Sequence, residues 1–298
     1  MSRLKEGLLK IKEDNKLFKR CNSKFGILLD DRIIKDGHIL FRLIALTDSV
    51  NGRFKSYDLG GYIEEESNLD KEGSSWIDYT SLVYDKARIL DNAYIRDNST
   101  IANSSEIIGN VIVSNNCNVI NNTIITDNSV IENNVILDCC KVTGDSLVCN
   151  NVKVIKSDIV SSSIQSTHNK DLVVEYSKIV LSYLKFYGRV YDTTIGSNSS
   201  ISLRDDGLSL FELVFPSDTS LTRARDLLVI REFLKYKTTV IVRNANKLIV
   251  GYGVDKVDAT IKIAFSDTID YKFNIEEGKL SFKEEEMLMS ILHGYFLK

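Results

Sequence analysis

Aliphatic side chains recur at every sixth position through the middle of the chain, and a compact residue stands two places before each of them. The aliphatic series is Ile77, Val83, Ile89, Ile95, Ile101, Ile107, Val113, Val119, Ile125, Ile131 and Leu137. This period does not fit the helical repeat of about 3.6 residues, but it keeps alternate side chains on one face of a strand. The pattern therefore predicts a parallel β-helix with three such segments per coil, whose core the aliphatic residues fill.

Turn-forming pairs such as Asp91-Asn92, Asn115-Asn116 and Asn133-Asn134 separate the segments. After Leu137 the phase slips by one residue, and the aliphatic series continues at Val142, Val148, Val154 and Val160. The pattern breaks between Ser163 and Glu175 and resumes loosely as far as Ile201. We expect coils from about Trp76 to Leu203, with the break forming a solvated loop that leaves at a corner.

The flanking segments follow different patterns. Leu4, Leu8, Ile11 and Phe18, with Asn15 in the same series, predict an N-terminal helix. Its spacing fits either the seam of a short coiled coil or an amphipathic helix lying on a neighbouring sheet. Two strands are expected at Lys24–Leu29 and His38–Leu46, around turn signals at Asp30-Asp31 and Lys35-Asp36-Gly37.

The C-terminal segment predicts an α+β module that caps the solenoid. Its expected strands are Ser209–Phe215, Thr238–Val242, Lys247–Tyr252, Thr260–Phe265 and Ile269–Ile275, and its expected helices are Leu221–Tyr236 and Phe282–Phe296. The predicted division is therefore residues 1–59 for the N-terminal helix and strands, 60–203 for the β-helix and 204–298 for the cap.

An ordered motif precedes the first coil: Leu43-Ile44-Ala45-Leu46-Thr47-Asp48, Gly60-Gly61-Tyr62-Ile63-Glu64, Asn68-Leu69-Asp70, Glu72-Gly73 and Trp76-Ile77. It resembles the opening of the YdcK-like hexapeptide-repeat proteins, over about residues 43–203. The resemblance implies a left-handed parallel β-helix, in a group often labelled transferase by analogy of fold. Tyr62 replaces the usual Trp and Asp70 the usual Ser, and no catalytic motif carries over.

Composition narrows the cellular context. The 298 residues carry a net charge of −3, which predicts no bulk attraction to nucleic acid or to anionic membranes. We expect no membrane span and no secretion leader, and five cysteines without metal-ligand spacing are typical of reduced, cytoplasmic thiols. Abundant Asn, Ile and Lys with a single proline indicate an AT-rich genome, bacterial or phage.

Candidate chemistry rests on one histidine. His38 lies in a strand-like segment outside the coils and His293 in the last predicted helix, whereas His168 stands in the excursion loop. Hexapeptide acyltransferases use such a histidine as general base with an acyl-coenzyme A donor, whose phosphates need cations. No lysine or arginine occurs from Asp97 to Cys140, and Lys141, Lys153, Lys156 and Lys170 are the nearest candidates for that patch.

Three functions remain open from the sequence. The first is a non-catalytic scaffold or binding module for a protein or a glycan, with no cofactor and no metal, that self-associates as a dimer or trimer. The second is an acyltransferase that uses His168 and acetyl-coenzyme A or another acyl-coenzyme A. The third is a phage-encoded inhibitor of a host protein.

Overall fold

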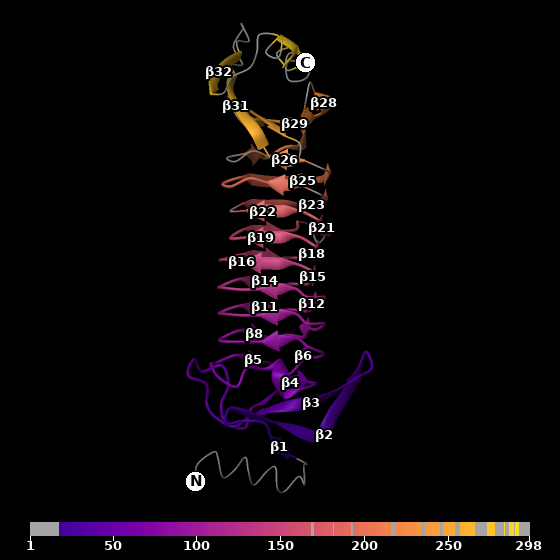
Figure 1. Ribbon diagram of the computed structural model, residues 1–298, viewed down its shortest axis with the longest axis vertical. Coiled ribbons are helices and arrows are strands. Elements are labelled where there is room, and N and C mark those ends of the chain that lie inside the picture. Colours follow the sequence, from indigo (N-terminus) through magenta and orange to yellow (C-terminus); the bar gives the residue numbers. More distant parts are fainter. Residues whose placement is uncertain are drawn as a thin grey trace. The chain divides into compact units, whose positions relative to one another are not determined.

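The computed structural model describes residues 18–167, 170–180, 182–191, 193–211, 213–215, 219–233, 236–244, 247–253, 257–265, 273–277, 283, 286–288 and 290–291. The predicted helix carrying Leu4, Leu8 and Ile11 lies outside these residues. The chain divides into two compact units, Met1–Glu175 and Tyr176–Lys298. The protein is mainly β and is built on a parallel β-solenoid, as its repeat predicts (Figure 1).

Three strands form each coil of the first unit, and each pairs in parallel with its equivalent in the next coil. The first ladder joins β6 (Leu82–Val83), β9 (Thr100–Ile101), β12 (Asn118–Ile120), β15 (Ile136–Asp138), β18 (Val152–Ile155) and β21 (Leu172–Glu175). The second joins β7 (Arg88–Ile89), β10 (Glu106–Ile107), β13 (Ile124–Ile125), β16 (Lys141–Thr143) and β19 (Asp158–Val160). The third joins β5 (Trp76–Ile77), β8 (Tyr94–Ile95), β11 (Ile112–Ser114), β14 (Val130–Glu132), β17 (Leu147–Cys149) and β20 (Ser163–Gln165).

The aliphatic series forms the core of these coils, where Ile77, Ile107, Val119 and their equivalents have no exposed surface. Equivalent positions lie 18 residues apart in the first coils, as Ser81 and Ser99 do. The offset falls to 17 between Thr123 and Cys140, where the phase of the sequence slips. Cys139 alone is left-handed at that corner, whereas Asn121 and Asn122 are both left-handed at the equivalent corner one coil earlier. The corner therefore absorbs the missing residue, and the core register continues.

Asparagine ladders stabilise the corners. Asn115 and Asn116 both adopt the left-handed conformation, with φ of 59° and 61°. Asn115 Nδ2 donates to Asn133 Oδ1 at 3.0 Å, and Asn133 Nδ2 donates to Asn150 Oδ1 at 3.2 Å. Asparagine suits these corners because its short polar side chain tolerates the left-handed region.

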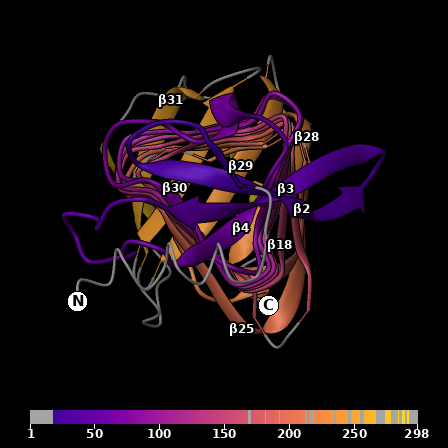
Figure 2. The ribbon, with the colours of Figure 1, turned by 90° about the horizontal axis from the view of Figure 1, so that it is seen from below.

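An antiparallel layer precedes the coils, formed by β1 (Phe18–Arg20), β2 (Phe25–Lys35), β3 (His38–Ala45) and β4 (Leu59–Ile63). The predicted turn at Asp30-Asp31 is wrong, because β2 continues through both residues with a register shift between Leu28 and Arg32. The predicted turn at Lys35-Asp36-Gly37 is confirmed, with positive φ at Asp36 and Gly37. The β2–β3 hairpin extends beyond the outline of the stacked coils in Figure 2.

The residues of the motif that precedes the first coil have structural roles. β4 pairs in parallel with β6 and so starts the first ladder. A Cβ at Gly60 would stand 2.7 Å from the Trp76 ring, so the glycine allows a close approach. The 3-10 helix η1 (Glu66–Asn68) follows. The buried Asn68 accepts from the amides of Glu64 and Glu65 and donates to two carbonyls of the next turn of chain.

The second unit contains further parallel strands and an antiparallel sheet. β22 (Lys178–Val180), β24 (Thr194–Ile195) and β26 (Val214–Phe215) form one parallel set, and β23 (Tyr183–Tyr191), β25 (Ser200–Phe211) and β27 (Ser220–Leu221) form another. The antiparallel sheet comprises β28 (Leu227–Phe233), β29 (Tyr236–Asn244), β30 (Lys247–Gly253), β31 (Val257–Phe265) and β32 (Phe273–Glu277). β29 and β30 contact β26 and β27.

The predicted helix from Leu221 to Tyr236 is wrong. After the short 3-10 helix η2 (Ala224–Asp226), the residues from Leu227 to Phe233 form strand β28, which pairs with β29. The β-branched Val229 and Ile230 and the aromatic Phe233 favour a strand in this segment. In the predicted last helix, the described residues Lys283, 286–288 and 290–291 are helical.

Candidate functional site

The outer face of the first ladder binds apolar side chains of the hairpin. Leu40 of β3 is fully buried against Tyr84 and Ala102, and Ile33, Leu82 and Ile120 pack around them. Alternation along β9 explains the contact, because Ile101 points into the core and Ala102 follows it on the opposite side. The coils therefore present an outward apolar surface that a β-hairpin covers.

The outer face of the third ladder is covered in a similar way at its start. Phe54, which is 3% exposed, stacks on Trp76 with ring centroids 4.3 Å apart. Arg53 donates to the Asn92 carbonyl, and its guanidinium carbon lies 5.2 Å from the centroid of the Tyr94 ring. Trp76 follows the alternation of its strand, so its side chain points to the opposite face from Ile77.

The same column continues beyond this loop with apolar residues. Register places Trp76, Tyr94, Ile112, Val130 and Leu147 in line on successive strands. The last four are each partly exposed. This apolar column, Tyr94–Leu147, extends a surface that already binds Phe54, and it is the first candidate site.

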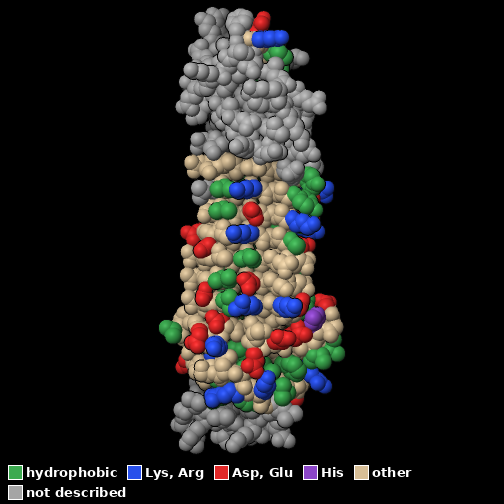
Figure 3. Space-filling view, viewed as in Figure 1, with side chains coloured by type: hydrophobic (Ala, Val, Ile, Leu, Met, Phe, Trp, Pro, Cys, Tyr) green, Lys and Arg blue, Asp and Glu red, His purple; other side chains and the backbone are tan. Residues whose placement is uncertain are grey.

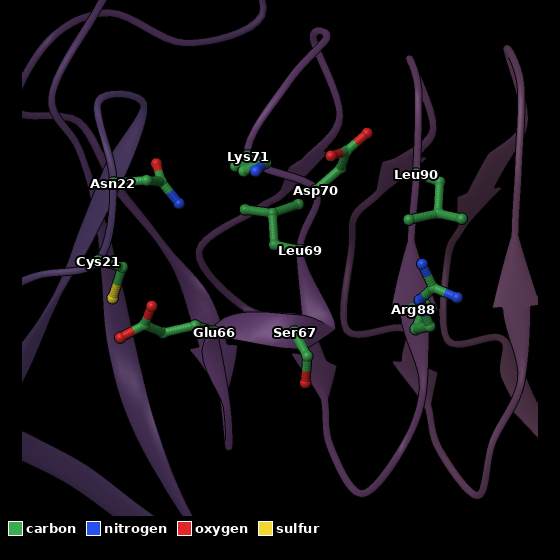
Figure 4. A pocket seen from close by; sticks show the side chains of 9 residues that line it. All are labelled: Cys21, Asn22, Glu66, Ser67, Leu69, Asp70, Lys71, Arg88 and Leu90. Atoms are coloured by element: carbon green, nitrogen blue, oxygen red, sulfur yellow. The ribbon is translucent and has the colours of Figure 1, made fainter.

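An open hollow of about 470 Å³ lies where the N-terminal layer meets the first coil. Its lining residues are Cys21, Asn22, Glu66, Ser67, Leu69, Asp70, Lys71, Arg88 and Leu90 (Figure 4). Two of its charges already have partners, since Glu66 pairs with Lys19 at 2.8 Å and Arg88 with Glu106 at 3.3 Å. The remaining surface mixes both signs, which favours no particular charge on a ligand.

The chemistry of this hollow argues against nucleophilic catalysis. Burial, reinforced by the Glu66 carboxylate, raises the pKa of the Cys21 thiol to about 12. The thiol therefore stays protonated near neutral pH, and the thiolate is the reactive form. The Ser67 hydroxyl donates to the Glu65 carboxylate at 3.1 Å, and the lining residues of the hollow include no histidine that could act as its general base.

Lys24 has a structural role next to this hollow. Its ammonium, on a residue 5% exposed, donates to the carbonyls of Asp70 and Glu72 at 2.9 and 3.1 Å and to Ser75 Oγ at 2.9 Å. Burial lowers its pKa to about 8. All three ammonium hydrogens have acceptors, so Lys24 acts as a structural link between strand β2 and the first coil.

Arg42 forms a second structural link. Its guanidinium lies between the rings of Tyr62 and Tyr79, 3.8 and 3.9 Å from their centroids. It donates to the carbonyls of Gly60 and Tyr79 and to the Tyr62 hydroxyl. Tyr62 therefore belongs to this cluster, and its hydroxyl donates to Asp31 at 2.8 Å.

His38 is a second candidate base that sequence reasoning left aside. Its Nδ1 lies 2.9 Å from both carboxylate oxygens of Glu64, which raises the pKa of the imidazole. A carboxylate that orients an imidazole is the arrangement a general base needs. The hollow, however, is lined by other residues. The Tyr84 hydroxyl donates to Asp36 at 2.7 Å and so joins the hairpin tip to the first coil, whereas His38 joins the tip to the residue after β4.

His168, the predicted catalytic residue, lies outside the described residues. The four lysines proposed to accompany it lie on several parts of the coils. Lys141 lies on the second ladder and Lys153 on the first, while Lys156 turns a corner and Lys170 follows the excursion.

Among the described residues, no group of three or more His, Cys, Asp and Glu side chains is arranged to hold a metal ion. No helix in that part of the chain is long and apolar enough to cross a bilayer. None of the five cysteines forms a disulfide. No protein-family model matches the sequence, and a search of curated proteins finds no relative.

Proposed function

We propose that the protein is a non-catalytic binding module whose β-solenoid presents the apolar column Tyr94–Leu147 to a protein partner. The observation that supports it most directly is the stacking of Phe54 on Trp76, at the start of the same column. A face that binds one apolar side chain of its own chain is suited to binding others. The asparagine ladders hold the surface rigid, which reduces the entropy lost on binding.

The resemblance to YdcK-like proteins is part of this proposal. It supports left-handed coils, and its transferase label rests on analogy of fold. The described part of the lead-in motif has structural roles, as Gly60, Asn68 and Trp76 illustrate. We therefore propose that this solenoid binds a partner and does not act as a transferase. The proposal includes a cytoplasmic location, and its alternatives are a glycan as partner and a phage-encoded inhibitor of a host protein.

The binding test uses peptides selected by display against the full chain. We expect selected peptides to be rich in apolar residues and to lose at least about tenfold in affinity with Val130→Glu. Ile136→Glu is the matched control, because it places the same charge on the first ladder. Equal loss in both variants, or selection of glycans alone on an array, would contradict the protein-binding proposal.

The acyltransferase is tested separately by calorimetry with acetyl-coenzyme A. We expect no binding, because the chain separates its lysines onto different faces. Micromolar binding, with turnover that His168→Ala abolishes and His38→Ala retains, would favour the enzyme. Circular dichroism on both variants would establish that the fold is kept.

A further inference from the structure

The loop between β3 and β4, residues 46–58, lies against the coils through two side chains. Phe54 is its only buried residue, whereas Val50 is fully exposed. Among the described residues, the hydrogen bonds and ring contacts between this loop and the coils come from Arg53 and Phe54 alone. Few contacts therefore hold the loop on the coil surface. We call residues 46–58 the covering loop.

The covering loop closes on itself. At its neck the Ala45 amide donates to the Asp58 carbonyl at 2.9 Å, and the Tyr57 amide donates to the Ala45 carbonyl at 2.8 Å. Within the loop, the Ser49 amide donates to the Phe54 carbonyl at 2.9 Å, and the Phe54 amide donates to Ser49 Oγ at 3.0 Å. None of these four bonds involves the coils. A compact loop with close ends can therefore leave the coils as a unit while β3 stays paired with β4.

The two contacting side chains occupy the start of the surface proposed to bind a partner. Phe54 stacks on Trp76, which precedes the apolar column Tyr94–Leu147 in the same register. The Arg53 guanidinium lies over the ring of Tyr94, the first residue of that column. The covering loop thus occupies the aromatic positions and leaves the aliphatic positions of the column uncovered.

The covered residues are those best suited to bind a partner tightly. Tryptophan and tyrosine supply large contact areas and are enriched among the residues that dominate the binding energy of protein interfaces. The four positions of the apolar column, about 4.8 Å apart, span only about 14 Å, which is short for a stable interface. On the face drawn in Figure 3, charged side chains gather over the N-terminal layer and are sparser on the coils. A partner of the column therefore gains most by also reaching Trp76.

We propose that the covering loop is an internal competitor for this surface, and that a protein partner displaces it to bind Trp76 and Tyr94. This inference rests on the proposed function, because it concerns the regulation of the same column. When the loop leaves, the partner places an apolar or aromatic side chain on the face of the Trp76 ring that Phe54 covered. The measured affinity is then the affinity of the open state multiplied by the fraction of chains that are open. Weaker contacts between the loop and the coils should therefore give tighter binding.

Loop variants test the competition with the peptides that display against the full chain selects, with affinity measured by calorimetry. Phe54→Ala removes the ring stacked on Trp76 and should raise peptide affinity at least about fivefold. Arg53→Ala removes the hydrogen bond to the Asn92 carbonyl from a partly exposed side chain, and should raise affinity about twofold to fivefold. Val50→Ala is the matched control, because this fully exposed side chain lies in the same loop, and it should leave affinity within about twofold.

Fluorescence quenching shows whether the partner reaches the ring that the loop covers. Trp76 is the only tryptophan of the chain, so its quenching by acrylamide reports how accessible this one ring is. Quenching should rise in Phe54→Ala, because one face of the ring loses its cover. Adding a selected peptide that lacks tryptophan to this variant should lower the quenching again, because the peptide takes the place of Phe54. A peptide that binds only the aliphatic positions leaves the quenching high.

The outcomes separate this inference from the function on which it rests. Peptides that Val130→Glu does not weaken would contradict the binding column itself. Peptides that Val130→Glu weakens, but whose affinity does not rise in Phe54→Ala, would overturn the internal competitor alone. An equal gain in Val50→Ala, or quenching of Trp76 that stays high with bound peptide, would overturn it as well. Circular dichroism checks the fold of each variant, and Arg53→Ala decides the competition if Phe54→Ala does not fold.

Discussion

The coils and the N-terminal layer, residues 18–75, are stabilised in different ways. In the coils one solution repeats, with an aliphatic residue in the core and an asparagine pair at a corner, as at Val119 and Asn116. In the N-terminal layer each contact occurs once, and single buried polar residues such as Lys24, Arg42 and Asn68 join it to the start of the coils. The stability of the coils is therefore distributed over many equivalent contacts, whereas the stability of the layer depends on a few.

The layer also divides the coil surface into a covered part and an uncovered part. The layer covers the outer face of the first coils, with Leu40 over Ala102 and Phe54 over Trp76. Beyond it, the same outward positions carry partly exposed residues such as Val130 and Ile124. A solenoid extends its sheets by repetition, so covering segments at one end leave later faces available for partners.

The largest effect is expected from a charge in the repeated core. Val119→Asp would place an unpaired carboxylate at a position with no exposed surface, and it should cost more than about 4 kcal/mol and abolish soluble protein. Asn116→Ser, at a nearby corner, should cost less than about 1 kcal/mol. Chemical denaturation and soluble yield are the measurements. Similar behaviour of both variants would show that the core register is wrong.

The next effect tests the single contacts of the layer. Asn68→Ala removes four hydrogen bonds and leaves the part-buried amides of Glu64 and Glu65 without this acceptor. We expect a loss of about 2–4 kcal/mol in the free energy of unfolding. Asn134→Ser in a ladder is the control. If the ladder residue cost as much as Asn68, the contrast between repeated and single contacts would fail.

A smaller effect is expected at Lys24. Lys24→Met keeps the length of the side chain but removes three hydrogen bonds to Asp70, Glu72 and Ser75. Burial of the ammonium offsets part of that stabilisation, as its lowered pKa indicates, so the net loss should be about 1–3 kcal/mol. Urea unfolding near pH 7 measures it. A more stable variant would mean that burial of the charge outweighs its hydrogen bonds.

The smallest effect concerns pH and the hairpin tip. The Glu64 carboxylate holds the pKa of His38 above its ordinary value, so the folded chain binds this proton more tightly than the unfolded chain. The stabilisation is present below the unfolded pKa, about 6.5, and is lost as pH rises through the folded pKa. The difference in melting temperature between the protein and His38→Gln should therefore shrink from about pH 6 to pH 8. A difference that grows over this range would reverse the assigned direction.

The sequence by itself determined the coils. A six-residue period of aliphatic positions fits only a strand that turns at regular corners, and the slip after Leu137 predicted where the corner at Cys139 loses a residue. The strands of the hairpin and its Asp36-Gly37 turn were also predicted, since local turn chemistry is sufficient there. Local patterns failed at Asp30-Asp31 and at Leu221–Tyr236, where strand pairing overrode turn and helix signals.

Only the tertiary structure decided which side chains meet. His38 and Glu64 are 26 residues apart, and Lys24 and Ser75 are 51 apart, so no local spacing predicts either contact. The alignment of the residues from Arg88 to Asp158 on one face is likewise not marked by a local sequence pattern, because they come from successive coils. Coil register brings them into line, and it depends on the packing of the whole core. Distant residues become neighbours only once that core has formed.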